Sequence, residues 1–435
     1  MRVRCLAALF VTLVVVWLGL DCRMPRAKAA ALTAGRHGFK FDFGPGTVAP
    51  GYIPVISDQF YTRERGFGFE PGAKVSCLDR GGKDPVRRDF CTSDKPFYFS
   101  VALPEGNYRV TVTLGDAQGE SSTTVKAELR RLVLERVKTA PGKFVTRSFV
   151  VNIRTPQIGS SAEVKLKDRE KTTEVWSWDE KLTLEFNDTR PSIAALEFIK
   201  VDNIPTVFLL GDSTVCDQPR EPYNSWGQML PRFFKSGIAV ANHAESGESV
   251  RSSLTAGRLD KVLSLMKPGD YLFIQYGHND EKEKGEGVGA FTTYKADLKR
   301  FVIASRKLGG IPVLLTPVQR RTFDENGKIT NSHGDYPEAV RRLAQEARVP
   351  LIDLHAMSTI FYEALGPERS KLAFKDGDGT HHNNYGSYEL AKCVAAGIKA
   401  NRLRIAKYLV RDFPEFDPRR PDPLKNVRVP PSPAP

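Results

Sequence analysis

The stretch "TVFLLGDSTV", residues 206–215, joins an apolar run to a polar turn. Its first half is continuously apolar, which is typical of a strand that is covered on both faces of a parallel sheet. Asp212, Ser213 and Thr214 follow directly where that run stops. Ligands of open parallel sheets bind beyond the carboxyl ends of the strands, so a hydroxyl raised at this point is a candidate for chemistry.

The rest of the C-terminal half repeats this rhythm of apolar runs and helical stretches. We expect further strands at 238–242, 271–276, 312–316 and 350–354, and helices near 226–235, 254–266, 294–308, 337–348 and 385–400. Strands that alternate with helices in this way predict an α/β fold with about five parallel strands covered on both faces.

The N-terminal half has a different period. Between residues 36 and 202, short runs of alternating apolar and polar residues are separated by turn residues, which predicts an all-β sandwich. Within it "FYFSVALPEGNYRVTVTL", residues 97–114, reads as two strands of a hairpin around a Pro-Glu-Gly-Asn turn. We therefore predict a β-sandwich domain at 36–202, a catalytic domain at 205–410, and a proline-rich tail at 413–435 that is extended or disordered.

The first 29 residues read as a signal peptide. Two arginines precede an apolar run at 6–20, and Ala27-Lys28-Ala29 offers a small-x-small cleavage site. The run is shorter than the ~20 residues of a membrane-spanning helix. We expect a secreted or periplasmic protein without stable membrane insertion after cleavage; an uncleaved N-terminal anchor is the alternative.

Charge and cysteines narrow the function further. Removing the five basic residues and one acidic residue of the leader lowers the formal net charge of +13 by four, and the remaining lysines and arginines are dispersed along the chain. This pattern does not favour nucleic acid as a partner. Cys77 and Cys91 could close a short disulfide loop in an oxidising compartment, whereas Cys216 and Cys393 are expected to be buried thiols in helical segments. No CxxC or His-rich spacing indicates a metal.

Three more stretches supply what a reactive serine needs: "ESGES" at 245–249, "YGHND" at 276–280 and "DGTHHN" at 378–383. A serine hydroxyl requires an adjacent base, which we assign to His381, and Asp378 three residues earlier can hold its imidazole. His382 is the alternative base.

The same stretches also offer donors to an oxyanion. The N–H groups of Ser213 and Gly247 and the side-chain amide of Asn279 could serve in that way, while the role of the neighbouring His278 is open. Each stretch alone is more typical of a turn or a helix cap. Together, at one edge of one sheet, they favour acyl transfer.

These stretches resemble the SGNH, or GDSL-type, hydrolases. "FLLGDSTV", "SWGQMLP", "ESGESVRSS", "GDYLFIQYGHND" and "GTHHNNYGSYELAK", which span about residues 205 to 405, look like rhamnogalacturonan acetylesterases and their bacterial relatives. The resemblance implies a flavodoxin-like three-layer fold, with Ser213, Gly247, Asn279 and His381 in the four blocks and Asp378 as the acid of the triad. Glu245 and Glu248 stand where those enzymes commonly have glycine or alanine.

The N-terminal half resembles, more faintly, the galactose-binding-like β-sandwiches of plant-polysaccharide enzymes. The likeness is carried by "KFDFGPG", "GFGFEPG" and "LPEGNYRVTVTLG". Five aromatic residues there could stack on sugars, but core positions are the more common place for such rings, and we assign no binding residues: these are Tyr61, Phe67, Phe69, Trp176 and Trp178.

The resemblance implies a secreted carbohydrate esterase that removes acetyl groups from pectin-type polysaccharide of the plant cell wall. A Ser-His-Asp acyl-enzyme mechanism needs neither a metal nor an organic cofactor. The charged loop at 279–289 is expected to be a solvated rim, or else to contact uronic acids through Lys282 or Lys284. The alternatives are an SGNH esterase or lipase for other acyl groups and a non-catalytic glycan-binding protein.

Overall fold

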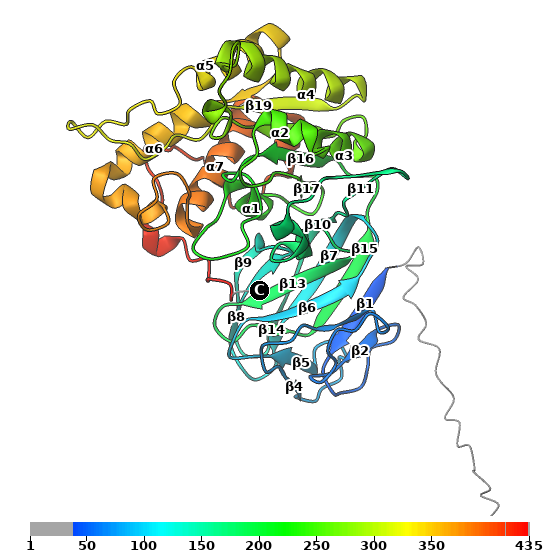
Figure 1. Cartoon of the computed structure of the whole chain (residues 1–435). Coiled ribbons are helices and arrows are strands. Elements are labelled where there is room, and N and C mark those ends of the chain that lie inside the picture. Colours follow the sequence, from blue (N-terminus) through cyan, green and yellow to red (C-terminus); the bar gives the residue numbers. More distant parts are fainter. Residues whose placement is uncertain (1–37, 414, 434–435) are drawn as a thin grey trace, which may run out of the picture.

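The computed structural model describes residues 38–413 and 415–433 (Figure 1). The predicted signal peptide lies outside the described residues. A β-rich half, residues 38–200, packs against an α/β half, residues 206–409. The predicted fold class is thereby confirmed, whereas the predicted domain boundaries stay predictions.

Two five-stranded sheets form the sandwich of the β-rich half. Their inward-facing side chains make one core, in which the rings of Phe41 and Phe99 meet edge to face with centroids 5.5 Å apart. In spatial order the first sheet contains β10 (Lys143–Ile153), β7 (Gly106–Asp116), β15 (Ala195–Lys200), β1 (Phe39–Phe43) and β2 (Ile53–Val55). The second contains β3 (Phe67–Phe69), β6 (Phe97–Ala102), β13 (Lys181–Asn187), β8 (Ser121–Ala127) and β9 (Arg131–Thr139). Smaller sheets are formed by β14 (Ser192–Ile193), β5 (Asp89–Thr92) and β4 (Ser76–Asp79), and by β11 (Gln157–Ile158) and β12 (Ala162–Glu163).

The predicted hairpin at 97–114 is wrong. Strand β6 pairs with β3 and β13, whereas β7 pairs with β10 and β15, so the two strands lie in opposite sheets. The turn between them carries the chain across the core. Turn residues indicate that the chain reverses, but they do not say whether the returning strand pairs with its predecessor or crosses to the other sheet of a sandwich.

The four cysteines of the described residues divide as two bonded and two free. Cys77 and Cys91 form a disulfide between the paired strands β4 and β5. Cys216 and Cys393 are free and buried. Cys393 lies in a helix as expected, but Cys216 lies in the turn after a strand.

A five-stranded parallel sheet forms the centre of the α/β half. Its spatial order is β17 (Ala239–Asn242), β16 (Thr206–Gly211), β18 (Tyr271–Gln275), β19 (Ile311–Leu315) and β20 (Leu351–Ile352). Counted in chain order within the sheet, this is the 2-1-3-4-5 order of flavodoxin-like folds. The order reverses direction at β16, so the loops after β16, β17 and β18 meet at the position where such sheets bind ligands.

Helices cover both faces of this sheet, which makes three layers. Val207 and Leu209 of β16 pack in one core with α1 (Trp226–Met229), α6 (Leu354–Arg369) and α7 (Asn384–Ala400). The alternate residues Phe208 and Leu210 pack on the other side with α2 (Val250–Thr255), α3 (Arg258–Leu265), α4 (Lys295–Lys307) and α5 (Tyr336–Ala347). No helix among the described residues has the length and apolar character to cross a bilayer.

Three predicted elements differ from the observed ones. The helix expected at 254–266 is two helices, because Gly257 takes a left-handed conformation with φ of 75° between α2 and α3. The strand expected at 350–354 is only two residues long, since Asp353 caps the helix α6, which we did not predict, by accepting the N–H of Ala356. The helix expected at 226–235 is α1 followed by a 3-10 turn, η3 (Leu230–Phe233), which contains Pro231.

The proline-rich tail returns to the β-rich half. Its described part contains no strand and a single 3-10 turn, in agreement with the extended alternative. Lys126 of β8 donates to the Pro430 carbonyl and to the Ser432 hydroxyl, both at 2.6 Å. Asn187 of β13 donates to the Pro431 carbonyl at 2.9 Å, so the end of the described tail lies beside β8 and β13 (Figure 1).

Candidate active site

The turn after β16 presents Ser213. The buried Asp212 accepts the N–H and the hydroxyl of Thr214 at 2.9 and 2.8 Å, and its carbonyl accepts the N–H groups of Val215 and Cys216. These bonds hold the turn closed, so that Ser213 stands at the end of the strand with 7% of its surface exposed.

Ser213, His381 and Asp378 form one hydrogen-bonded chain. The Ser213 Oγ lies 3.0 Å from His381 Nε2, and His381 Nδ1 lies 2.8 Å from Asp378 Oδ2. Burial alone would raise the pKa of Asp378, but hydrogen bonds from the Thr380 N–H and from His381 lower it below its usual value. The carboxylate therefore stays charged, which suits it to hold an imidazole that becomes cationic.

His382 has entirely different surroundings. Its Nε2 lies 2.6 Å from the hydroxyl of Tyr362, and the side chain is buried. Burial, together with the charge of His381, lowers the pKa of His382 to about 3. The structure thus brings His381, and not His382, to Ser213.

The three predicted oxyanion donors face one hollow. Ser213, Gly247 and Asn279 all line it, and within residues 38–413 and 415–433 the N–H groups of Ser213 and Gly247 donate no hydrogen bond. Gly247 has φ of 76°, a conformation that a side chain disfavours. The amide of Asn279 is oriented by its bond to the Glu248 carbonyl at 3.0 Å and by Lys282, which donates to its oxygen. The second hydrogen of the Asn279 amide is therefore available to donate to a bound ligand.

This hollow has a volume of about 580 Å³. Its lining is mostly polar: Ser213, Gln218, Tyr223, Ser246, Gly247, His278, Asn279, Lys282, Arg320, Asp378, Thr380 and His381. Two larger hollows, of 660 and 650 Å³, contain none of the predicted site residues. The chemistry of the lining, and not its size, therefore identifies the candidate site.

Sequence reasoning missed some of the residues at this hollow. Gln218 donates to the Ser213 carbonyl at 2.7 Å and to the Ser246 hydroxyl at 3.3 Å, so it links the first and second loops. The ring of Tyr223 meets that of His381 edge to face. Gln218 lies only five residues after Ser213, so its closeness in the sequence could have indicated a role at the site. No sequence pattern indicates Tyr223.

His278, whose role we left open, contacts the first loop. Its Nδ1 lies 3.1 Å from Asp212 Oδ2, and the side chain is 2% exposed. Burial raises the pKa of Asp212, but the contacts with His278 and Thr214 outweigh it and lower that pKa. The pair ties the loop after β18 to the loop after β16.

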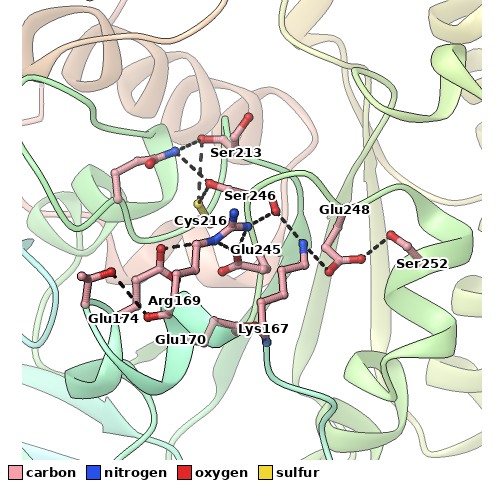
Figure 2. Close-up of polar contacts among 12 residues, drawn as sticks. Lys167, Arg169, Glu170, Glu174, Ser213, Cys216, Glu245, Ser246, Glu248 and Ser252 are labelled. Carbon is pink, nitrogen blue, oxygen red and sulfur yellow. Dashed lines mark hydrogen bonds and ion pairs between the residues drawn. The ribbon is translucent and has the colours of Figure 1, made fainter.

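Glu245 and Glu248 face away from the hollow, toward the β-rich half (Figure 2). Glu245 Oε1 accepts from Arg169 Nε at 2.7 Å, and Glu248 Oε1 lies 2.7 Å from Lys167 Nζ. The two residues that depart from the pattern of the resembled enzymes therefore connect the two halves of the chain.

The aromatic residues of the β-rich half mostly belong to its core. Phe67, Phe69 and Trp178 are buried. Tyr61 and Trp176 are half-buried, with Lys181 Nζ 4.8 and 5.8 Å from their ring centroids. None of these five residues lines the 580 Å³ hollow.

Comparisons with known proteins agree with this architecture. Residues 209–387 match the GDSL-like lipase/acylhydrolase family, and residues 39–154 match the galactose-binding domain-like region of β-agarases and YxiM-like esterases. Rhamnogalacturonan acetylesterase RhgT of Bacillus subtilis is 43% identical over 47% of this chain and 94% of its own length. The uncharacterized esterase YxiM of the same organism is 31% identical over 83% of this chain and 90% of its own length.

A crystal structure of B. subtilis YxiM superimposes with a TM-score of 0.46 at 27% identity, covering 84% of this chain and 99% of that one. The sequence matches extend over both halves of the chain, and the hydrolase match contains all five predicted site residues. The chain belongs to the GDSL-like lipase/acylhydrolase family, as an ester hydrolase of the SGNH acetylesterase type with a galactose-binding-like region in its N-terminal half.

Proposed function

We propose that this protein is an exported carbohydrate acetylesterase that deacetylates a pectin-type polysaccharide. The observation that carries the proposal is the chain of contacts from Asp378 through His381 to Ser213, with distances of 2.8 and 3.0 Å, in a hollow lined by N–H groups without acceptors among the described residues. A serine, an oriented imidazole and free donors at one point are the requirements of acyl transfer.

The reaction proceeds in two halves. Ser213 Oγ attacks the acetyl carbonyl carbon while its proton passes to His381 Nε2, and the carbonyl oxygen becomes an oxyanion held by Ser213, Gly247 and Asn279. When the tetrahedral intermediate collapses, the bond to the sugar oxygen breaks and His381 gives that oxygen its proton. Water then attacks the carbonyl carbon of the acetyl-serine and gives a proton to His381. His381 passes that proton to Ser213 Oγ as the bond to the acetyl group breaks, and acetate leaves.

Two observations favour a pectin-type substrate. The relative RhgT, 43% identical over 94% of its own length, is a rhamnogalacturonan acetylesterase. Lys282 lines the hollow and brings a positive charge to its rim, which suits a polymer that carries uronic acid carboxylates. The charged loop at 279–289 thus contributes to substrate binding in this proposal.

Export rests on two independent features. One is the signal-like composition of residues 1–29, and the other is the disulfide between Cys77 and Cys91, because disulfides persist in oxidising compartments. N-terminal sequencing of the protein recovered outside the cytoplasm should begin near residue 30. A cytoplasmic protein with an intact leader would contradict export.

Acetate release from acetylated rhamnogalacturonan, acetylated xylan and small acetyl esters tests the function. We expect the wild-type protein to release acetate, fastest from the pectin-type polymer, and the Ser213→Ala variant to be folded and inactive. Faster release from xylan would overturn the substrate, and faster cleavage of long-chain nitrophenyl esters would favour a lipase. No acetate from any of these, with glycan binding retained, would favour the non-catalytic alternative.

A further inference from the structure

The peptide between Ser246 and Gly247 has its two polar groups in opposite surroundings. Its N–H belongs to Gly247, which lines the hollow together with Ser213, and donates no hydrogen bond among the described residues. Its carbonyl belongs to Ser246 and accepts hydrogen bonds from Lys167 Nζ at 2.7 Å and from the Arg169 guanidinium. Figure 2 shows both cations reaching this loop from the β-rich half. Because N–H and C=O point in opposite directions in a trans peptide, the cations lie behind the oxyanion donor.

We propose that Lys167 and Arg169 are positioning residues of ester hydrolysis, which orient the Ser246–Gly247 peptide and polarise it so that the Gly247 N–H binds the oxyanion more strongly. Charged donors make the shorter and stronger hydrogen bonds to a carbonyl. Electron density drawn to the carbonyl oxygen leaves the nitrogen of the same resonant amide, and hydrogen bonds in a chain strengthen one another. The inference rests on the proposed function, since it needs an oxyanion at Ser213.

Carboxylates on both sides of the peptide hold the two cations. Glu248 Oε1 lies 2.7 Å from Lys167 Nζ, and Glu245 Oε1 accepts from Arg169 Nε at 2.7 Å. The side chains of the two glutamates are only 2% and 5% exposed, whereas those of Lys167 and Arg169 are 34% and 41% exposed. The glutamates of this loop thereby keep a positive charge on each side of the Ser246 carbonyl.

The segment that carries the cations is itself anchored. Arg258 at the start of α3 forms an ion pair at 2.6 Å with Glu170, and both side chains are at most 1% exposed. Glu170 also accepts the backbone N–H of Lys167 at 2.8 Å and the indole N–H of Trp178 at 3.0 Å. The 3-10 turn η1 (Asp168–Lys171) is thus fixed against the α/β half before any substrate arrives, as preorganised stabilisation of charge requires.

A purely structural role would have a different signature. If the four charged residues only join the two halves, their loss lowers the melting temperature and leaves kcat of the folded enzyme unchanged. If the cations act on the oxyanion, kcat falls while KM is nearly constant, because the oxyanion exists in the transition state and the tetrahedral intermediate but not in the bound ester.

The test uses the full-length enzyme with a small acetyl ester. Lys167→Met is the main variant because Lys167 is one-third exposed and Glu248 keeps a second cation, Arg258 Nε at 3.6 Å. Lys167→Arg is the conservative variant, and Lys171→Met, an exposed lysine on the same turn, is the matched control. The affinity for a trifluoromethyl ketone is measured beside kcat and KM. The serine oxygen adds to the carbonyl carbon of such a ketone, and the resulting hemiketal carries an oxyanion.

We expect Lys167→Met to lower kcat by about tenfold, a part of the 10²–10³-fold that loss of a whole oxyanion donor costs. Affinity for the ketone should fall by a similar factor, Lys167→Arg should restore both, and Lys171→Met should resemble the wild type. An unchanged kcat and ketone affinity in Lys167→Met, with or without a lower melting temperature, would overturn the inference.

The doubly substituted Lys167→Met, Arg169→Gln enzyme should lose more than Lys167→Met alone. If it does not fold, the single variant and its arginine counterpart still decide the outcome. A wild-type enzyme that releases no acetate would overturn the proposed function and this inference together. An active wild type whose kcat and ketone affinity are unchanged by Lys167→Met would refute the inference alone.

Discussion

The loop at 378–383 lines the active-site hollow, the segment at 167–174 contacts another of its loops from behind, and the two are built in opposite ways. In the loop, Asp378 contacts the N–H of Thr380 and the ring of His381, two and three residues away. In the segment, Lys167 and Arg169 contact a loop that lies 79 and 76 residues further along the chain. Contacts of the first kind leave a pattern in the sequence, and contacts of the second kind do not. Replacing one partner at a time tests how much each kind contributes.

The largest effect is expected at His381. His381→Ala removes the base that activates Ser213 and should lower kcat by about 10⁶-fold, because removing the histidine of a serine hydrolase triad costs roughly that much. The fold should survive, since the side chain is 32% exposed. His382→Gln is the matched variant: it should keep kcat within about tenfold and lower the melting temperature instead, since Tyr362 loses its partner. Equal losses of kcat in the two variants would contradict the assignment.

Breaking the buried pair between the halves should have the next largest effect. Glu170→Gln leaves Arg258 buried with less compensating charge, so we expect the free energy of unfolding to fall by about 3–5 kcal/mol in urea titrations. Glu338→Gln removes an exposed pair with Arg342 on α5 and should change the same quantity by at most about 1 kcal/mol. If the two variants lost the same stability, the contacts between the halves would be no more than surface contacts.

Asn279 tests the donor that comes from the loop after β18. Asn279→Ala should lower kcat by about 10²-fold with little change in KM, because its amide acts on the oxyanion and not on the ground-state ester. Asn331→Ala, in an exposed loop where the side chain donates to the Gly334 carbonyl and accepts the N–H of His333, should leave both constants unchanged. An unaltered kcat in Asn279→Ala would remove that residue from the oxyanion site.

The neighbouring Asp280 should make the stability of the protein depend on pH. Burial raises the pKa of its carboxyl group from 3.8 to about 8, against the effect of a hydrogen bond from the Val250 N–H. The folded protein therefore keeps a proton that the unfolded chain releases, so this group's contribution to stability is lost as the pH rises from about 4 to about 8. Asp280→Asn has no such proton. The melting temperature of Asp280→Asn should therefore rise relative to that of the wild type as the pH increases across this range. A difference in melting temperature that does not change with pH would contradict the assignment.

The sequence predicted the features that depend on short-range pattern. The five strands were found because each is a buried apolar run, and the loops after β16, β17 and β18 were expected at one edge because parallel strands share their direction. The choice of His381 over His382 followed from its spacing to Asp378. Tertiary contacts decided the remainder: the crossing of β6 and β7 to opposite sheets, the helix α6 behind a two-residue strand, and the cations behind Gly247.

The returning tail has a further consequence for how the molecule comes apart. Lys126 and Glu185 of the sandwich are each 2% exposed, and both bond Ser432, which follows the entire α/β half in the chain. When that contact opens, Lys126 and Glu185 each lose a hydrogen-bond partner while they are buried, and this destabilises the sandwich. Heating should therefore give one cooperative calorimetric peak for the whole molecule, and a chain cut after residue 413 should melt at a lower temperature.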